Sequence, residues 1–322
     1  MSEFICKDAA VTDVEMVVNL HVTERCNYQC TYCFGKWLPL EGFTKDETAW
    51  AETATAHSIM SELAARFRRD RSEGSPLRFN FVGGEPALLP NVADLIEYAR
   101  HDLQARASYV TNGLMLQRFT PEWTVENVAI VGVSIDSSIS TTNLEIGRAT
   151  RSGMAFDLGK VADQIAGIRE AADRMKVAPP EIKVNTVVSA LNVGEDFENV
   201  LTSVRPDRWK ILKMLPVYSS ETAVSDEAFR EFARQYEAFV DNRSGLTGVV
   251  ITTEDNDEMT GSYAMVDPLA RFFWYDEVPE NGYGYSEPMT EVSVDEAWNA
   301  VPWDQQKFDL RYTELMGDMS RP

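Results

Sequence analysis

Strand-length apolar runs alternate with helical patterns along most of this 322-residue chain, and that order constrains the fold more than any other feature. Such alternation predicts parallel strands joined by right-handed helical crossovers. Six repeats of this unit fit an α/β fold with either a partial barrel or a doubly wound sheet. The expected strands are 15–22, 77–82, 107–111, 128–135, 182–189 and 209–217, and the expected helices are 45–68, 91–102, 158–175, 194–201 and 226–240.

The segment 246–322 departs from this alternation. It is rich in Asp, Glu, Gly, Pro and aromatic residues, and helical periodicity occurs in it only in pieces. A chain of this length can bury one large core. We therefore expect residues 1–245 to form the core domain and residues 246–322 to form an extension packed over one end of it.

The composition is that of an ordinary water-soluble chain, with 44% hydrophobic and 25% charged residues. The formal net charge of −21 argues against nucleic acid or an anionic membrane as a partner, because both repel an acidic surface. No apolar run approaches the ~20 residues that span a bilayer, and the N-terminus lacks the pattern of a secretory signal. We expect a cytoplasmic protein that binds no membrane, with the monomer as the default oligomeric state.

Three of the four cysteines, Cys26, Cys30 and Cys33, lie together in a single loop directly after the first expected strand. Structural zinc sites commonly use four ligands in two separated pairs, but Cys6 is the only other cysteine and His21 is the only histidine nearby. Three thiolates in one loop instead suit an iron–sulfur cube that leaves one iron open to another ligand. A zinc site and three unliganded cysteines remain the alternatives.

The spacing Cys-x3-Cys-x2-Cys, with an aromatic residue before the last cysteine, resembles the signature of the radical S-adenosylmethionine (SAM) enzymes. Gly83-Gly84-Glu85-Pro86 follows the second expected strand, and Thr111-Asn112-Gly113 follows the third. The resemblance implies that the cysteines hold a [4Fe–4S] cluster whose open iron is chelated by SAM. It also implies that the GGEP loop binds the methionine amino group of SAM, and that the fold is a partial (β/α)6 TIM-like barrel.

Polar residues recur on one face of four expected strands. Side chains alternate between the two faces of a strand, and strands of a parallel sheet usually read as continuously apolar. Since burying unpaired cations is costly, this face predicts a pocket for a polyanion such as a triphosphate, although ion pairs with neighbouring acids would explain single residues. The residues that share the face are Asn19 and His21, Arg78 and Asn80, Lys183 and Asn185, and Arg208 and Lys210.

Beyond the SAM motifs, the chain resembles the viperin-like radical SAM enzymes along nearly its whole length. The matches outside the shared SAM core include Ile146-Gly147-Arg148, Arg208-Trp209-Lys210 and Ser262-Tyr263. Enzymes of this family convert a ribonucleoside triphosphate to its 3′-deoxy-3′,4′-didehydro form, which terminates chains made by viral polymerases. The resemblance therefore implies an antiviral nucleotide dehydratase that acts on CTP, UTP or GTP.

The resemblance also implies roles for individual residues. Tyr263 would relay a hydrogen atom late in the reaction, although a packing role fits this tyrosine equally well, and the segment 246–322 would close the active site. Arg78 stands where animal members of the family have lysine. The remaining roles are cluster ligation by Cys26, Cys30 and Cys33, SAM binding by Gly84, Glu85, Asn112, Ser134 and Arg148, triphosphate binding by Arg78, Lys183, Arg208 and Lys210, and sugar or base binding by Asn19 and Asn185.

The implied chemistry begins when an electron from a flavodoxin- or ferredoxin-type donor enters the cluster and SAM is cleaved to methionine and a 5′-deoxyadenosyl radical. This radical abstracts the ribose 4′ hydrogen; loss of the 3′ hydroxyl as water, with one further electron and one proton, completes the reaction. Two other functions fit parts of the sequence: a radical SAM enzyme acting on a peptide, and a non-catalytic iron–sulfur or zinc-binding regulator. The lack of cysteines after Cys33 argues against the first, and the GGEP motif argues against the second.

Overall fold

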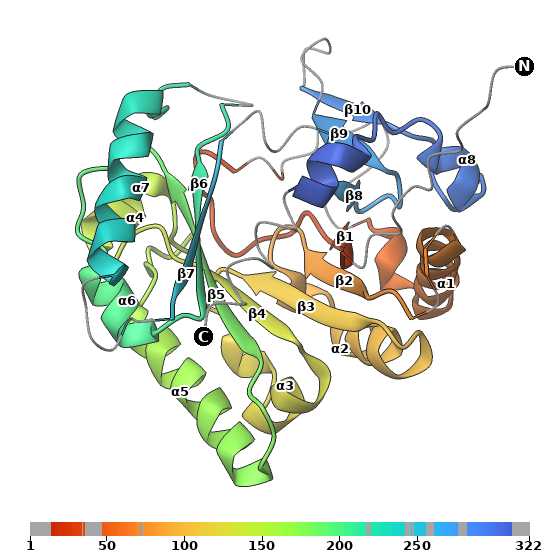
Figure 1. Cartoon of the computed structure of the whole chain (residues 1–322), viewed down its shortest axis with the longest axis horizontal. Coiled ribbons are helices and arrows are strands. Elements are labelled where there is room, and N and C mark those ends of the chain that lie inside the picture. Colours follow the sequence, from red (N-terminus) through yellow and green to blue (C-terminus); the bar gives the residue numbers. More distant parts are fainter. Residues whose placement is uncertain are drawn as a thin grey trace, which may run out of the picture.

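The computed structural model describes residues 14–33, 35, 47–69, 71–72, 74–216, 220–241, 246, 248–255, 261–275 and 282–310. Eight strands form one parallel sheet in the order β7-β6-β5-β4-β3-β2-β1-β8, which curls into a half barrel (Figure 1). The expected partial TIM-like barrel is therefore confirmed. The strands of this sheet are β1 (Met16–His21), β2 (Leu77–Val82), β3 (Arg106–Thr111), β4 (Ile130–Ser134), β5 (Glu181–Val188), β6 (Arg208–Lys213), β7 (Val250–Glu254) and β8 (Ala264–Val266), and a separate antiparallel hairpin holds β9 (Phe273–Tyr275) and β10 (Tyr283–Tyr285).

Helices follow the strands in sequence and cover the outer face of the sheet (Figure 1). α2 runs directly into a π-helical turn at Tyr98–Asp102, and a short 3-10 turn at Ala49–Ala51 precedes α1. The helices are α1 (Thr53–Arg69), α2 (Val92–Glu97), α3 (Pro121–Asn127), α4 (Ser140–Ile146), α5 (Leu158–Met175), α6 (Glu198–Val204), α7 (Asp226–Asp241) and α8 (Val294–Trp298).

All six expected strands are present, with ends shifted by a few residues. The last of them ends at Lys213 instead of 217, and residue 217 itself lies outside the described residues. The helix expected at 45–68 becomes α-helical only at Thr53, because the Thr48 side chain caps the preceding 3-10 turn by accepting a hydrogen bond from the Trp50 N–H. The short helices α3, α4 and α8 were not expected, since one or two turns give too little periodicity to detect.

Residues of the expected C-terminal extension complete the sheet at both edges. β7 pairs in parallel with β6, and β8 pairs in parallel with β1. The fully buried Trp50 donates its indole N–H to the carbonyl oxygen of Asp267, which ties the segment after β8 to the core. The sequence did not reveal these strands, because β8 has three residues and β7 follows no clear alternation.

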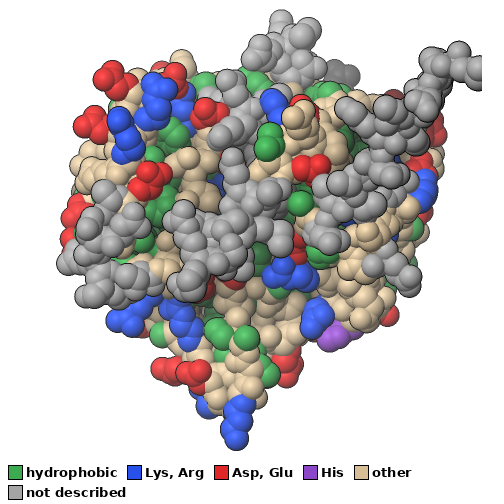
Figure 2. Space-filling model, in the orientation of Figure 1, with side chains coloured by type: hydrophobic (Ala, Val, Ile, Leu, Met, Phe, Trp, Pro, Cys, Tyr) green, Lys and Arg blue, Asp and Glu red, His purple; other side chains and the backbone are tan. Residues whose placement is uncertain are grey.

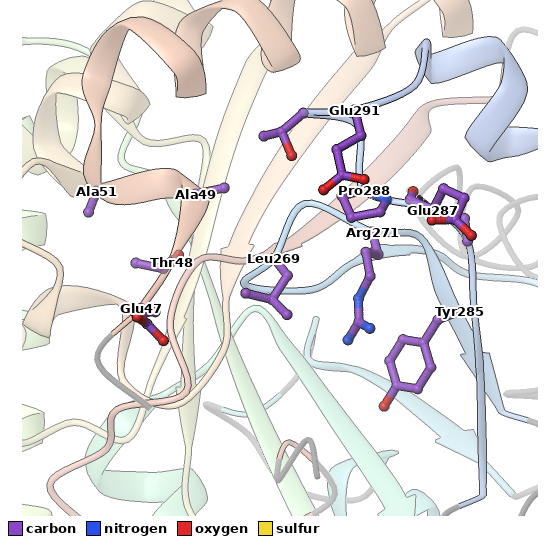
Figure 3. A pocket seen from close by; sticks show the side chains of 12 residues that line it. Glu47, Thr48, Ala49, Ala51, Leu269, Arg271, Tyr285, Glu287, Pro288 and Glu291 are labelled. Atoms are coloured by element: carbon purple, nitrogen blue, oxygen red, sulfur yellow. Dashed lines mark hydrogen bonds between the residues drawn. The ribbon is translucent and has the colours of Figure 1, made fainter. Parts of the chain in front are cut away.

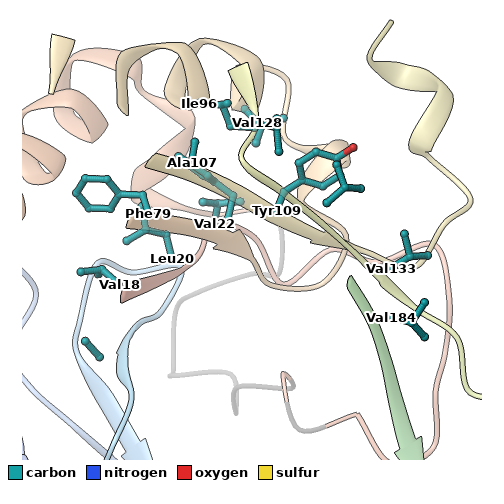
Figure 4. Packing of buried hydrophobic residues seen from close by; sticks show 14 of the residues in the cluster. Val18, Leu20, Val22, Phe79, Ile96, Ala107, Tyr109, Val128, Val133 and Val184 are labelled. Atoms are coloured by element: carbon teal, nitrogen blue, oxygen red, sulfur yellow. The ribbon is translucent and has the colours of Figure 1, made fainter. Parts of the chain in front are cut away.

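The hydrophobic core lies between the sheet and its helices (Figure 4). Alternate strand residues point into it, and Val18, Leu20, Phe79 and Val133 are all completely buried. Apolar burial of this kind contributes about 25 cal/mol per Å² and fixes which face of each strand meets the helices. The remaining residues of each strand consequently face the inside of the half barrel.

The surface carries both signs of charge. Acidic and basic side chains are interspersed on the face shown in Figure 2, although the formal net charge of the whole chain is −21. Within the residues that the structure describes, every helix is too short or too polar to cross a membrane.

Candidate active site

The cysteine loop begins directly after β1, at the carboxyl edge of the sheet. Cys26 is exposed, Cys30 and Cys33 are partly buried, and none of the three forms a disulfide with a residue that the structure describes. Burial raises the pKa of Cys30 to about 12, an effect that the nearby Arg148 guanidinium opposes. The Cys26 sulfur accepts a hydrogen bond from the Tyr28 backbone N–H at 3.4 Å. Because metal ligation requires thiolates, filling this site releases protons.

The glycines of the GGEP motif hold the start of the cysteine loop. The Gly84 N–H donates to the Thr23 carbonyl oxygen at 2.7 Å, and the Glu85 N–H donates to the Arg25 carbonyl oxygen at 2.8 Å. A β-carbon on Gly84 would overlap the backbone of Arg25. Part of the reason for glycine here is therefore close backbone contact with the loop that carries the cysteines.

The Ile146-Gly147-Arg148 motif holds the other end of the same loop. The Gln29 N–H donates to the Gly147 carbonyl oxygen at 3.0 Å, and the Thr31 N–H donates to the Ile146 carbonyl oxygen at 2.9 Å. Gly147 ends α4 with a φ of 84°, and a β-carbon there would overlap the Gln29 carbonyl oxygen. Two backbone segments thus clamp the cysteine loop from opposite sides.

Glu85 and Asn112 connect the loops after β2 and β3. The Glu85 carboxylate is 0% exposed and accepts hydrogen bonds from the Thr111 hydroxyl and from the Asn112 backbone N–H at 2.9 Å. The Asn112 side-chain amide in turn donates to Asn27 Oδ1 at 2.5 Å and lies 3.7 Å from the Cys26 sulfur. Glu85 therefore positions the loop that touches the cysteines, and its carboxylate is already enclosed by donors.

The buried Glu85 carboxylate should make stability depend on pH. Burial raises its pKa from an ordinary 4.5 to about 7. Folding therefore favours the protonated form of Glu85. Its stabilising contribution to the folded state is fully present below pH 4.5 and is lost as pH rises through 7. In protein without bound iron, the free energy of unfolding measured with urea should fall by about 3 kcal/mol at most between pH 5 and 8. Glu85→Gln should remove this slope; parallel profiles for the two proteins would contradict the assignment.

Arg148 is buried at the centre of the loops that follow β1, β3 and β4. It forms an ion pair with Asp136 at 2.7 Å, with side-chain exposures of 4% and 1%. It also donates to the carbonyl oxygens of Ser134 at 2.5 Å and Asn112 at 3.3 Å. The Asp136 carboxylate additionally accepts from the Tyr32 hydroxyl, between two of the cysteines. Arg148 and Ser134 are therefore adjacent, as their shared predicted role requires.

The predicted polar residues of β1 and β2 share the inner face of the barrel. Asn80 lies opposite Asn19 in the sheet register and donates to its side-chain oxygen at 2.7 Å. Arg78 donates to the Ser108 hydroxyl at 2.8 Å and pairs with Glu15 at 2.7 Å. His21 is buried against Phe273, and burial lowers its pKa to about 3, so the imidazole is neutral.

The predicted cations of β5 and β6 also meet on the inner face, but most of them have carboxylate partners. Arg208 lies 2.9 Å from Glu181, and Lys210 pairs with Glu254. Together with the Arg78 pair, this means that neighbouring acids compensate several of these charges, which is the alternative that the sequence left open for single residues. Lys183 is different, because it forms no hydrogen bond or ion pair with any residue in the described part of the chain.

Lys183 lies beside Arg208 in the register of β5 and β6. Burial lowers its pKa well below the ordinary value, and the neighbouring Lys210 and Arg208 lower it further. Asn185 lies two residues further along β5, opposite Lys210 and next to Gly132 of β4. The Glu254 carboxylate offsets the repulsion among these cations only in part, so a bound anion would be favoured here.

Tyr263 lies on the same inner face, just before β8. Its hydroxyl accepts a hydrogen bond from Lys210 at 2.7 Å and donates one to Glu254 at 2.6 Å. The structure therefore places this tyrosine next to a predicted triphosphate ligand. Sequence reasoning missed Glu15, Asp136, Glu181 and Glu254, since nothing in the local sequence marks an acid as the partner of a cation on another strand.

A separate cavity of about 820 Å³ opens between the residues before α1 and the segment after β8 (Figure 3). Arg271 and Tyr285 line it, with the guanidinium 4.1 Å from the ring centroid, and Arg271 pairs with the buried Asp267. Among the residues that the structure describes, none of the predicted site residues lines this cavity. It is therefore distinct from the inner face of the barrel.

Comparisons with known proteins give a consistent result. The family model described as the Radical SAM superfamily matches residues 20–201. A protein of Psychrobacter lutiphocae named S-adenosylmethionine-dependent nucleotide dehydratase is 35% identical over 304 residues, covering 94% of this chain and 96% of that protein. A protein of the same name from Pseudoalteromonas ulvae is 32% identical, covering 94% of each chain. The Oncorhynchus mykiss protein named S-adenosylmethionine-dependent nucleotide dehydratase RSAD2 is 30% identical, covering 90% of this chain and 77% of that one.

Solved structures share the architecture at low sequence identity. Streptococcus suis SuiB bound to S-adenosylmethionine has a TM-score of 0.61 at 12% identity, covering 94% of this chain and 68% of that one. The structure of anSMEcpe with bound AdoMet also has a TM-score of 0.61, at 15% identity, covering 92% of this chain and 82% of that one. At these identities the likeness concerns the fold.

Proposed function

Because this chain belongs to the radical SAM superfamily and, within it, to the viperin-like S-adenosylmethionine-dependent nucleotide dehydratases, we propose that it removes water from the ribose of a nucleoside triphosphate. The product would be the 3′-deoxy-3′,4′-didehydro nucleotide, and CTP, UTP and GTP are the candidate substrates. The observation that carries the proposal is the similarity to proteins of that name over 94% of the chain. The polar inner face of the barrel supports it with a place for the substrate.

The enzyme uses a [4Fe–4S] cluster and SAM, and the residues present fit both groups. Three thiols share one loop, and N–H groups of Tyr28 and Asn112 point at the Cys26 sulfur, as is common for cluster sulfurs. When bound, the cluster and SAM together supply the radical that removes a hydrogen atom from the substrate. Gly84, Glu85, Asn112, Ser134 and Arg148 surround the cysteine loop and would orient SAM there, Glu85 through the loops it connects.

The strand register suggests how the substrate lies. Arg78, Lys183 and Arg208 occupy the amino-terminal halves of β2, β5 and β6, whereas the cysteine loop follows the carboxyl end of β1. From Lys183 to the end of β5 at Val188 the chain rises about 16 Å. We infer that the triphosphate lies deep in the barrel and that Asn19 and Asn185 contact the sugar or base nearer the cluster. Such fixed positioning makes hydrogen abstraction selective for the 4′ carbon.

The reaction must finish with one electron and one proton. After the 4′ hydrogen is removed, breaking the 3′ C–O bond and forming the 3′,4′ double bond requires an electron for the sugar and a proton for the departing hydroxyl. We propose that Tyr263 supplies the electron with loss of its own proton, and is restored by a second electron from a flavodoxin- or ferredoxin-type donor and a proton. The role rests on the position of Tyr263 beside Lys210.

The C-terminal extension, the oligomeric state and the location of the protein are proposed on separate grounds. We propose that residues 246–322 close the mouth of the barrel over residues 1–245, which would exclude water from a reactive radical. Deleting the extension is not a clean test, because β8 pairs with β1 inside the sheet. We further propose a cytoplasmic monomer that binds neither nucleic acid nor membrane, on the basis of the net charge of −21.

Nucleotide-dependent turnover tests the proposed function. The anaerobically reconstituted enzyme, with SAM and dithionite, should form 5′-deoxyadenosine faster with one of the four ribonucleoside triphosphates than without nucleotide. Lys183→Met should raise the KM for that triphosphate by about tenfold or more, because it removes an ammonium that has no carboxylate partner among the described residues. Equal background formation with all four nucleotides would contradict the assignment.

Arg106→Met provides a matched control for the lysine substitution. Arg106 is likewise a cation of the sheet, but it pairs with Glu15 at 2.7 Å and its side chain is 49% exposed. Its removal should change the KM little, since surface pairs contribute little. An equal effect of both substitutions would indicate general loss of positive charge instead of a phosphate site at Lys183.

A further inference from the structure

The side chains of Lys210, Glu254 and Tyr263 each contact the other two. Lys210 belongs to β6, Glu254 ends β7, and Tyr263 precedes β8, so three separate segments meet here. Lys210 pairs with one carboxylate oxygen of Glu254, and Tyr263 donates to the other at 2.6 Å. The Lys210 and Glu254 side chains are only 13% and 9% exposed.

The chemistry of the three groups fixes the direction of each hydrogen bond. An ammonium can only donate and a carboxylate can only accept. The Tyr263 oxygen therefore accepts from Lys210, and its single hydrogen is given to Glu254. A phenol can lose an electron readily only if its proton leaves as well, and the Glu254 carboxylate lies at the distance needed to receive it.

The Lys210 ammonium would also interact with a triphosphate bound in the barrel. Lys210 lies opposite Asn185 in the sheet and interacts electrostatically with Lys183, the cation without a carboxylate partner in the described residues. A triphosphate bound at Lys183 and Arg208 would compete with Glu254 for Lys210. Losing that cation makes the Glu254 carboxylate a stronger base.

We propose that Glu254 is the proton acceptor of Tyr263 and that triphosphate binding strengthens it by drawing Lys210 away. This inference rests on the proposed function and assigns a role to a residue that the family resemblance did not supply. The electron of the Tyr263 O–H bond passes to the sugar while its proton passes to Glu254, and the 3′ hydroxyl leaves as water with a proton from solvent. One electron from the flavodoxin- or ferredoxin-type donor and the proton held by Glu254 then restore Tyr263.

Glu254→Gln separates this role from a structural one. Removing the charge frees Lys210 for phosphate, so the Kd of the preferred triphosphate, measured by calorimetry, should fall by about fivefold. Removing the acceptor should lower the yield of didehydro nucleotide per 5′-deoxyadenosine by at least about tenfold. A local packing defect would weaken triphosphate binding and also lower the yield. Tighter binding together with a lower yield therefore identifies the proposed role.

Glu181→Gln is the matched control. Glu181 pairs with Arg208 at 2.9 Å as Glu254 pairs with Lys210, but its contacts are with Arg208 and not with Tyr263. This substitution should tighten triphosphate binding to a similar extent and keep the yield per 5′-deoxyadenosine. A loss of yield equal to that of Glu254→Gln would overturn the inference.

Glu254→Asp keeps the test decisive if Glu254→Gln does not fold. The shorter side chain keeps the negative charge but withdraws the carboxylate from Tyr263, so the yield should fall severalfold; an unchanged yield overturns the inference. If the unaltered protein binds none of the four triphosphates, the proposed function fails together with the inference. If it binds one and the Glu254 variants keep full yield, the function stands and only the inference fails.

Discussion

Gly147→Ala is expected to prevent assembly of the iron–sulfur cluster while leaving the barrel folded. Gly147 has a φ of 84°, a conformation that costs alanine about 1 kcal/mol. The larger effect is steric, because the added methyl group would overlap the Gln29 carbonyl oxygen next to Cys30. The Gln29 and Thr31 hydrogen bonds to this segment would break, and the cysteine loop would lose one of its two clamps.

Iron content and visible absorption after anaerobic reconstitution measure this effect. Gly147→Ala should retain severalfold less iron than the unaltered protein. Gly153→Ala is the matched control, since Gly153 has a similar φ of 81° but no atom within 4 Å of an added β-carbon. Equal iron in both variants would show that backbone strain, and not contact with the cysteine loop, decides the outcome.

Arg148→Met is expected to cause the largest loss of stability of any single substitution considered. Asp136 is 1% exposed and would keep a buried charge without its cation. Breaking a buried ion pair by removing one partner typically costs about 3–5 kcal/mol. The carbonyl oxygens of Ser134 and Asn112 would also lose their donor, so SAM binding should weaken as well.

Urea unfolding before reconstitution measures the stability change. Arg174→Met is the control, because Arg174 also pairs with an acid, Glu122, but both side chains are at least half exposed. Little change is expected there, since exposed ion pairs contribute little. A comparable loss of stability in both variants would show that burial does not make the Arg148–Asp136 pair more stabilising than an exposed pair.

The sequence was sufficient to predict the order of the first six strands and the inner face of four of them. Strict alternation places Lys183 and Asn185 on one face of β5 and Ile182 and Val184 on the other, and the second pair is completely buried. The spacing of Cys26, Cys30 and Cys33 likewise indicates a shared loop. These are local properties, determined by residues that are near one another in the chain.

Contacts between distant segments could not be predicted in the same way. Glu254 is recognised as the partner of Lys210 only once β7 is paired with β6, and β7 lies in the segment 246–322 whose irregular pattern did not reveal it. The same holds for the Ile146-Gly147-Arg148 motif, in which the sequence indicated a role in SAM binding for Arg148 alone. The structure adds a second role for this motif, since its backbone holds the cysteine loop.

We propose that the substrate of this enzyme is a nucleoside triphosphate from which the ribose 4′ hydrogen is removed. The most direct measurement uses the preferred triphosphate carrying deuterium at the 4′ position of ribose, and records the mass of the 5′-deoxyadenosine formed. We expect the 5′-deoxyadenosine to gain one deuterium, and a didehydro nucleotide that lacks the elements of water to appear with it. Unlabelled 5′-deoxyadenosine formed alongside an unchanged nucleotide would contradict the account.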